Sequence, residues 1–173
     1  MNRNAQGGNV LFMILIACAL LGALGAVMMR DGGQNATTMS ADKISETLTS
    51  QVQTIRSALM ECNLTYNFGY PTIASDEVND LQCQIDDVPT YKDIFKNNAN
   101  YTSMQGPTGF GNWQYANDGA GTITIAIISD HPGDAAVRAA LDRMSRVFDT
   151  GNGEADIVND GNTASLTVYI QKP

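Results

Sequence analysis

Residues 40–62 read SADKISETLTSQVQTIRSALMEC, and this stretch has the apolar spacing of an amphipathic helix. Its large aliphatic side chains recur every three or four residues, at Ile44, Leu48, Val52, Ile55 and Leu59. Because an α-helix turns once in 3.6 residues, this spacing places all five on one face. Ser40 is a candidate cap for the helix. Lys43, Glu46 and Arg56 are expected to point away from the apolar stripe, so the sequence predicts a helix that packs one face against the rest of the chain.

An uncharged run precedes this stretch: residues 10–29 contain no charged residue and no Asn, Gln, Ser or Thr. At a rise of 1.5 Å per residue, a helix of this length spans about 30 Å, which is the thickness of a bilayer's hydrocarbon core. We therefore expect a transmembrane helix over residues 9–29, preceded by a polar leader at 1–8. Arg3 lies before the run, whereas Arg30 behind it is offset by the adjacent aspartate. This small bias predicts a cytoplasmic N-terminus and an exported remainder.

A glycine pair, Gly32-Gly33, separates the apolar run from the amphipathic stretch. Each glycine weakens a helix by about 1 kcal/mol relative to alanine, so residues 30–39 are expected to form a hinge. The remaining residues, 40–173, are enough for one exported head domain that includes the amphipathic helix at 40–62.

The segment from Asn63 to Gly111 is rich in Asn, Asp, Gly and Pro and shows no sustained period beyond a short helical turn near Tyr91–Lys96. A loop of this length inside a compact domain requires a covalent or packing tie. Cys62 and Cys83 are the only cysteines outside the apolar run, and an oxidising compartment would join them. We expect this disulfide to stabilise the head by about 3 kcal/mol.

Secondary-structure signals become clear towards the C-terminus. Alternating and β-branched residues predict a short strand at Trp113–Ala116, a longer one at Thr122–Ser129, and two further strands near Ala155–Val158 and Ser165–Gln171. A helical period over Asp134–Phe148 lies between the second and third strands, and turn residues occupy 117–119 and 159–162. The predicted fold class is α+β: a long N-terminal helix, a small antiparallel sheet and one further helix.

Composition excludes one function class and disfavours another. The chain has 18 acidic and 10 basic residues, a net charge of −8, and no cluster of Lys and Arg, so a nucleic-acid binder is excluded. The one histidine, His131, belongs to the sequence Ser129-Asp130-His131, but three consecutive residues cannot converge as nucleophile, base and orienting acid. We predict a turn there, no catalytic residues and no cofactor, and therefore a protein that is not an enzyme.

A metal site is likewise not predicted, although one weak set of candidates exists. Asp149, Asn152, Glu154 and Asp156 could supply oxygen ligands to calcium. Their spacing does not fit the calcium loop of an EF-hand, and a solvated turn between helix and strand is the favoured interpretation.

The N-terminus admits three interpretations. As a secretory signal peptide it would be cut after Ala23-Leu24-Gly25, although the apolar run is longer than such signals usually have. As a lipoprotein signal, Leu15-Ile16-Ala17-Cys18 has the form of a lipobox in which Cys18 would carry the lipid. That interpretation would make the protein a membrane-anchored or lipidated surface binding domain.

The third interpretation rests on a family resemblance. A short leader ending in Gly7-Gly8, an apolar helix directly after it, an amphipathic continuation and a cysteine-bearing head resemble type IV pilins and the pseudopilins of type II secretion. The resemblance implies that prepilin peptidase cuts after Gly8 and makes Asn9 the new N-terminus, with methylation among the expected modifications. It also implies a structural filament subunit that is single-pass in the inner membrane, with its head in the periplasm or outside the cell. Its partners would be prepilin peptidase, an inner-membrane assembly platform and other pilin-like subunits.

Further residues bear on this resemblance. Asn112-Trp113-Gln114-Tyr115 before an Ile-rich strand, and residues 141–152 before two closing strands, are similar to pilin-type heads. The fifth residue after the expected cut is Met13, where most pilins carry glutamate, so a minor or initiating subunit and a divergent major subunit both stay open. Cys18, Gly22 and Ala26 lie four apart, and small residues at that spacing let helices approach closely in a membrane or filament, although Ala and Gly are common in membrane helices anyway.

Overall fold

The structure is a computed structural model that describes residues 37–65, 69–71, 76–85, 90–96, 98, 100–148 and 150–172. The chain divides into two compact units, Met1–Met39 and Ser40–Pro173. The predicted leader, the predicted membrane helix and most of the predicted hinge therefore lie outside the described residues. Among the residues that are described, no helix is long and apolar enough to cross a membrane.

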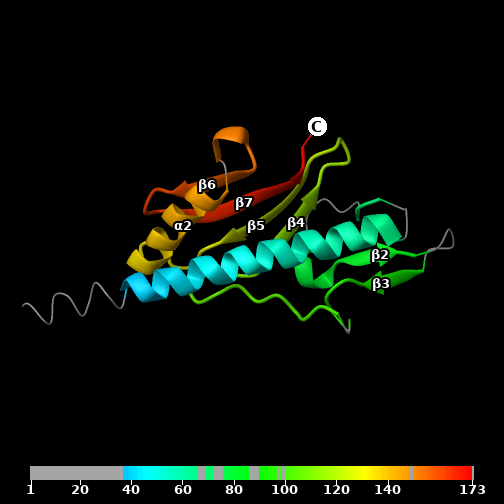
Figure 1. Cartoon of the computed structure of the whole chain (residues 1–173), viewed down its shortest axis with the longest axis horizontal. Coiled ribbons are helices and arrows are strands. Elements are labelled where there is room, and N and C mark those ends of the chain that lie inside the picture. Colours follow the sequence, from blue (N-terminus) through cyan, green and yellow to red (C-terminus); the bar gives the residue numbers. More distant parts are fainter. Residues whose placement is uncertain are drawn as a thin grey trace, which may run out of the picture. The chain divides into compact units, whose positions relative to one another are not determined.

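Helix α1 covers residues 37–65 (Figure 1) and buries the predicted apolar face. The five aliphatic residues at Ile44, Leu48, Val52, Ile55 and Leu59 are all buried. The helix is already formed at residue 37, so Ser40 lies inside it, and the prediction that Ser40 caps the helix is wrong. The helical period identifies a buried face well, but it locates helix ends only to within a few residues.

Arg56 differs from the expectation that it points away into solvent. Lys43 and Glu46 are exposed as predicted, whereas Arg56 is only partly exposed. Its Nη2 donates a hydrogen bond to the carbonyl oxygen of Tyr169 (3.2 Å), and its guanidinium carbon lies 5.6 Å from the ring centroid of Phe148. The side chain therefore ties α1 to two distant segments, because an arginine can lay its aliphatic part along the core edge and keep its charge solvated.

A five-stranded antiparallel sheet forms the second layer (Figure 1). Its spatial order is β1-β4-β5-β7-β6, and the strands are β1 (Asp76–Glu77), β4 (Gln114–Asn117), β5 (Ile123–Ile128), β6 (Ala155–Asn159) and β7 (Ala164–Gln171). The last four confirm the predicted strands. The longest pairing joins β5 to β7, with Ile127 opposite Leu166 and Ile125 opposite Val168.

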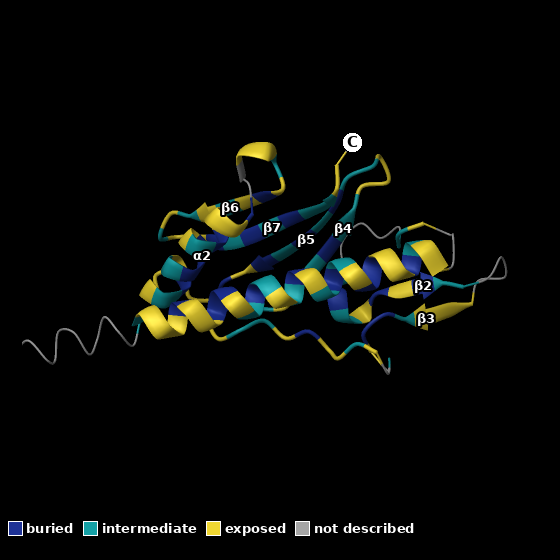
Figure 2. Ribbon diagram, viewed as in Figure 1, coloured by how far each residue is buried: buried dark blue, intermediate teal, exposed yellow. Residues whose placement is uncertain are grey.

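The core lies between α1 and one face of this sheet (Figure 2). Alternate residues of β5 and β7 are buried because successive side chains of a strand point to opposite faces. The apolar face of α1 belongs to the same buried cluster, together with Trp113 and Tyr115. Burial raises the pKa of Tyr115 to about 12, and its hydroxyl donates to the carbonyl oxygen of Pro71 (2.8 Å).

Helix α2 (Ala135–Val147) completes the core and confirms the predicted second helix. Asp134 caps it, since a carboxylate oxygen accepts hydrogen bonds from the backbone amides of Ala136 (2.7 Å) and Val137 (3.2 Å). Val137, Ala140, Leu141 and Met144 are buried. The hydroxyl of Thr49 donates to the sulfur of Met144 (3.4 Å), so α2 contacts α1 directly.

The segment expected to be one long loop contains more structure than predicted. It holds β1, the 3₁₀-helix η1 (Val78–Asp80) and a separate two-stranded sheet of β2 (Gln82–Gln84) and β3 (Tyr91–Asp93). The helical turn predicted near Tyr91–Lys96 is wrong, because residues 91–93 form a strand. Strands of two or three residues are too short for a periodic signal, and β1 also depends on a distant partner, β4.

Two aspartates organise the tight turns at the ends of the strands. At the β4–β5 turn, Asp118 accepts hydrogen bonds from the amides of Ala120 (2.8 Å) and Thr122 (2.9 Å). At the β6–β7 turn, Asp160 accepts from the amides of Asn162 (2.9 Å) and Thr163 (2.7 Å). These hydrogen bonds lower the pKa of both carboxyls. The largest contribution comes from Thr122 for Asp118 and from Thr163 for Asp160.

The lowered pKa values predict an acid-dependent contribution to stability. A carboxyl whose folded pKa lies below its unfolded value of about 3.9 stabilises the fold above that value, and the contribution is lost as the pH falls through the folded pKa. We expect the Asp118→Ala, Asp160→Ala double variant to lose stability at pH 7 and to respond less to acid between about pH 4 and pH 2. Urea midpoints against pH measure this, with Glu46→Ala as the control. Parallel pH profiles for wild type and double variant would contradict the prediction.

A second prediction concerns the docked face of α1. Residues 36–173 should fold without the preceding segment, because the compact unit Ser40–Pro173 contains the whole described core. In this fragment Ile55→Ala should lower the free energy of unfolding by roughly 2–5 kcal/mol, since it leaves a cavity against the sheet. Ser57→Ala, on the exposed side of α1, should leave it nearly unchanged. Equal unfolding midpoints for the two variants would show that α1 is not docked.

Candidate assembly surface

The exposed side of α1 carries a second regular pattern. Its most outward residues follow spacings of three and four, and all of them are exposed: Lys43, Glu46, Ser50, Gln53, Ser57, Met60 and Leu64. We call this set the outer stripe of α1. An average spacing of 3.5 residues is the period at which one helix packs lengthwise against another.

The composition of the outer stripe is unusual for a solvent-facing helix. From Ser50 to Leu64 the stripe has no charged member, although the chain as a whole carries a net charge of −8. It ends in two exposed apolar side chains, Met60 (49% exposed) and Leu64 (79% exposed). The two serines, Ser50 and Ser57, are small enough to let another helix approach closely. The outer stripe is therefore a surface of α1 on which a partner can pack.

Gln51 fixes the middle of α1 to the rest of the head. Its Nε2 donates to the carbonyl oxygen of Gln105 (2.6 Å), and its Oε1 accepts a hydrogen bond from the indole Nε1 of Trp113 (2.8 Å). One amide side chain thus satisfies the buried indole and holds the loop that follows β3. Such a contact fixes the position of α1, and hence the direction in which the outer stripe faces.

The C-terminal end of α1 is held by a covalent bond. Cys62 and Cys83 form the predicted disulfide, with a Cα–Cα distance of 5.8 Å, and this joins α1 to β2. Next to it, the hydroxyl of Tyr101 donates to the carboxylate of Glu61 (2.8 Å). That hydrogen bond, together with burial and the carboxylate's charge, raises the pKa of Tyr101. The disulfide and this hydrogen bond therefore hold the last turns of α1 against the rest of the head, while Met60 and Leu64 stay exposed.

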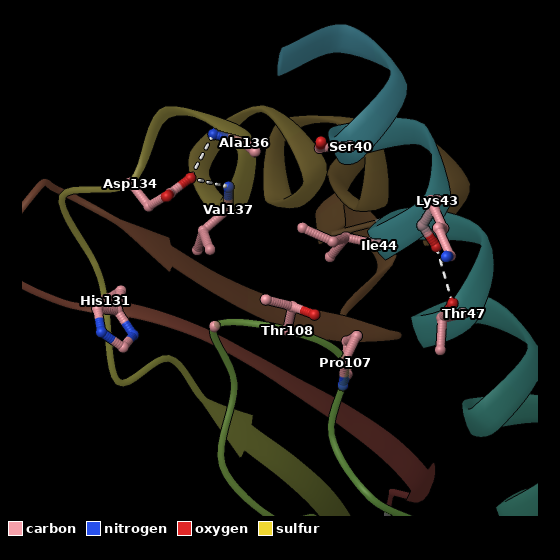
Figure 3. Close-up of a pocket in the computed structure, with 11 residues that line it drawn as sticks. Ser40, Lys43, Ile44, Thr47, Pro107, Thr108, His131, Asp134, Ala136 and Val137 are labelled. Atoms are coloured by element: carbon pink, nitrogen blue, oxygen red, sulfur yellow. Dashed lines mark hydrogen bonds between the residues drawn. The ribbon is translucent and has the colours of Figure 1, made fainter. Parts of the chain in front are cut away.

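A groove of about 610 Å³ lies at the opposite end of α1 (Figure 3). Its walls come from α1, from the loop at 107–109 and from the start of α2, and its lining residues are Ser40, Lys43, Ile44, Thr47, Pro107, Thr108, Gly109, His131, Asp134, Ala136 and Val137. Ile44 extends from α1 towards the α2 side of the groove, Val137 lies across from it at the start of α2, and both are buried (Figure 3). The groove therefore has an apolar wall on each side and a polar rim.

Hydrogen bonds hold the backbone of the groove in place at Gly109. The carbonyl oxygen of Gly109 accepts from the hydroxyl of Ser129 (2.6 Å) and from the amide of Asp130 (3.1 Å). Gly109 has φ +88°, and a Cβ at that position would press on Val137, so a glycine is required there. Asp134 at the rim is the cap of α2. The groove is consequently built by residues that also hold the fold.

The residues of the Ser129-Asp130-His131 sequence form the predicted turn between β5 and α2. Ser129 is buried, and besides donating to Gly109 its hydroxyl oxygen accepts a hydrogen bond from the amide of His131 (3.0 Å). The imidazole of His131 lies on the groove side opposite α1 (Figure 3). In this part of the chain the three residues shape a turn and a groove wall.

The other predicted site residues are only partly described. Gly8, Asn9, Met13, Cys18, Gly22 and Ala26 lie outside the described residues, and so does Asp149. Among the described residues no group of three or more His, Cys, Asp or Glu could hold a metal ion. Of the remaining calcium candidates, Asp156 accepts a hydrogen bond from the hydroxyl of Tyr169 (2.6 Å), while Asn152 lies in the 3₁₀-helix η2 (Thr150–Asn152) and Glu154 is exposed.

The outer stripe and the groove were not predicted from the sequence. The spacing of the stripe and its uncharged part from Ser50 to Leu64 are visible in the sequence, but the exposure of Met60 and Leu64 is known only from the structure. The groove joins three segments that are distant in the chain, and no local pattern marks it. Searches against protein-family models, curated proteins and solved structures found no match.

The disulfide generates a prediction for the braced end of α1. Replacing Cys62 and Cys83 by serine in residues 36–173 should lower the free energy of unfolding by about 3 kcal/mol, because the unfolded chain regains the freedom of a loop of this size. Denaturant unfolding measures the loss. A thiol reductant should lower the wild-type midpoint to that of the double variant and leave the variant unchanged. A wild type that is insensitive to reductant would contradict the assignment.

Proposed function

We propose that this protein is a structural subunit of a type IV pilus-like or secretion-type pseudopilus filament, anchored in the inner membrane before assembly. The observation that supports this most is the outer stripe of α1, which follows in the chain from an uncharged run long enough to span a bilayer. A long helix of this kind packed on an antiparallel sheet, with a disulfide at its end, is consistent with a pilin-like architecture.

The mechanism is assembly, and the proposal assigns no reaction or cofactor to the chain. Prepilin peptidase would remove residues 1–8 on the cytoplasmic side and leave Asn9 as the N-terminus. An inner-membrane assembly platform would then move the subunit into a filament, where its apolar helix exchanges lipid for neighbouring helices. Cys18, Gly22 and Ala26 would permit close packing of those helices. The head of residues 40–173 would lie in the periplasm or outside the cell.

Met13 bears on the role within the filament. A glutamate there would meet a neighbour's amino group in an apolar surrounding, and an ion pair in that setting sets the register of the partners. With methionine in its place, this subunit would join the filament by packing alone. A minor or initiating subunit and a divergent major subunit both fit that behaviour.

A second candidate function is a membrane-anchored or lipidated binding domain. Two observations favour it: the lipobox-like Leu15-Ile16-Ala17-Cys18 and the groove of Figure 3, which is within the usual size range of ligand pockets. In that case the mature protein begins at a lipid-modified Cys18, and a surface ligand occupies the groove.

The experiment that separates these functions is the intact mass of the protein extracted from membranes. We expect a mature chain that begins at Asn9. Gly8→Val should keep the leader attached and prevent assembly, because the peptidase accepts a residue without a side chain at that position, whereas Gly7→Ala is the matched control. A mass that begins at a lipidated Cys18 would support the binding domain, one that begins near Ala26 would indicate a secreted protein, and either would overturn the filament proposal.

A further inference from the structure

We propose that the groove of Figure 3 receives the C-terminal end of α1 from a second copy of this chain. In this contact Met60 and Leu64 enter the groove, and Glu61 meets Lys43 at its rim. The inference rests on the proposed function and deepens it, since it names the surfaces by which two heads meet. We refer to Met60, Glu61 and Leu64 together as the α1 knob.

The groove offers an apolar space that the described part of the chain leaves open. Ile44 lies on its α1 side and Val137 on its α2 side, with Thr108 and Pro107 on the loop below them in the view (Figure 3). Its volume of about 610 Å³ is ample for two aliphatic side chains. Because Gly109 is clamped by Ser129, the groove is preformed, and an occupant does not have to open it.

The α1 knob is the matching projection. Leu64 is 79% exposed and Met60 is 49% exposed, and a spacing of four residues places them on one side of the helix. The Cys62–Cys83 disulfide lies between them in the chain and holds this last turn against β2. A rigid apolar projection loses little conformational freedom when it binds, and burying it removes its surface from water.

The charges of the chain indicate which partner can bind in the groove. Copies that carry a net charge of −8 repel one another, so contacts between heads are favoured where opposite charges face each other. Lys43 is exposed at the groove rim, where Asp134 is also exposed, and Glu61 is exposed next to Met60 in the knob, where it accepts a hydrogen bond from Tyr101. A second copy therefore brings one acid to one base, together with apolar surface for an apolar groove.

The position of the two surfaces explains how the contact would propagate. Ile44 and Leu64 are twenty residues apart on the same helix, which corresponds to about 30 Å. Because the groove and the knob are different surfaces at opposite ends, the contact is heterologous, and every added copy keeps one of them unoccupied. Such a contact adds copies without end unless the rotation between successive copies closes a ring. A helical filament follows from a single kind of contact.

The test uses the full chain in its own membrane with a photo-crosslinking residue in place of Thr108, at the groove. Copies with and without ¹⁵N are mixed, so that products between two copies are recognised by mass. We expect a product that joins position 108 to a peptide within residues 57–65 of another copy. The same residue in place of Ala120, in the exposed β4–β5 turn, is the matched control and should not give this product.

Charge reversal sharpens the test. Lys43→Glu and Glu61→Lys should each reduce the yield of the product several-fold, and the double variant should restore it, because only the pair re-establishes opposite charges. Both side chains are exposed, but Glu61→Lys also removes the hydrogen bond that the Tyr101 hydroxyl donates to Glu61, so Tyr101→Phe is measured beside it and should leave the yield unchanged. Arg146→Glu on the exposed side of α2 is the control and should leave the yield unchanged. Equal loss in the double variant and the single variants would overturn the pairing of Lys43 with Glu61.

The outcomes separate this inference from the proposed function. A product between position 108 and another segment of a second copy, or its absence in cells that form filaments, overturns the groove contact and leaves the filament subunit standing. A product with lipid or with an unrelated protein also overturns it and supports the binding-domain function. A chain that forms neither filaments nor products between copies contradicts both proposals.

Discussion

The packing of the apolar face of α1 against the sheet is the contact on which the other features depend. Ile44, Leu48, Val52, Ile55 and Leu59 are buried against β5, β7 and α2, and this burial is the main source of stability available to a head of this size. It also determines which side of α1 remains in water. The outer stripe, the braced C-terminal end and the wall of the groove all follow from the orientation in which this one face docks.

Polar side chains fix the position of α1 along the sheet and its rotation about its own axis. Gln51 satisfies the indole of Trp113 and holds the carbonyl of Gln105, while Arg56 reaches the backbone of β7 and the ring of Phe148. An apolar face alone would tolerate a rotation or a shift along the sheet. These directional contacts resist such a movement, because it would break them and would leave the buried indole N–H of Trp113 unsatisfied.

Much of the fold could be predicted because its signals are local. The buried face of α1, helix α2 and strands β4 to β7 each contain enough residues for a period, and Cys62 and Cys83 were the only possible pair outside the apolar run. Strands β1 to β3 were missed because two or three residues carry no period. Arg56 was misplaced because its partners, Phe148 and Tyr169, are about a hundred residues away. The groove required three separate segments to be placed in space, which no local pattern reports.

The sheet's order along the chain has a consequence for biosynthesis. α1 is made first, yet the strands that cover it end near the C-terminus, and Leu59 precedes Leu166 by 107 residues. At a translation rate of about 5–20 residues per second, β7 is synthesised roughly 5–20 s after α1. During that interval the nascent helix exposes a continuous apolar surface. The helix cannot complete its docking until β7 has been made, so the timing of synthesis becomes part of how this head reaches its native state.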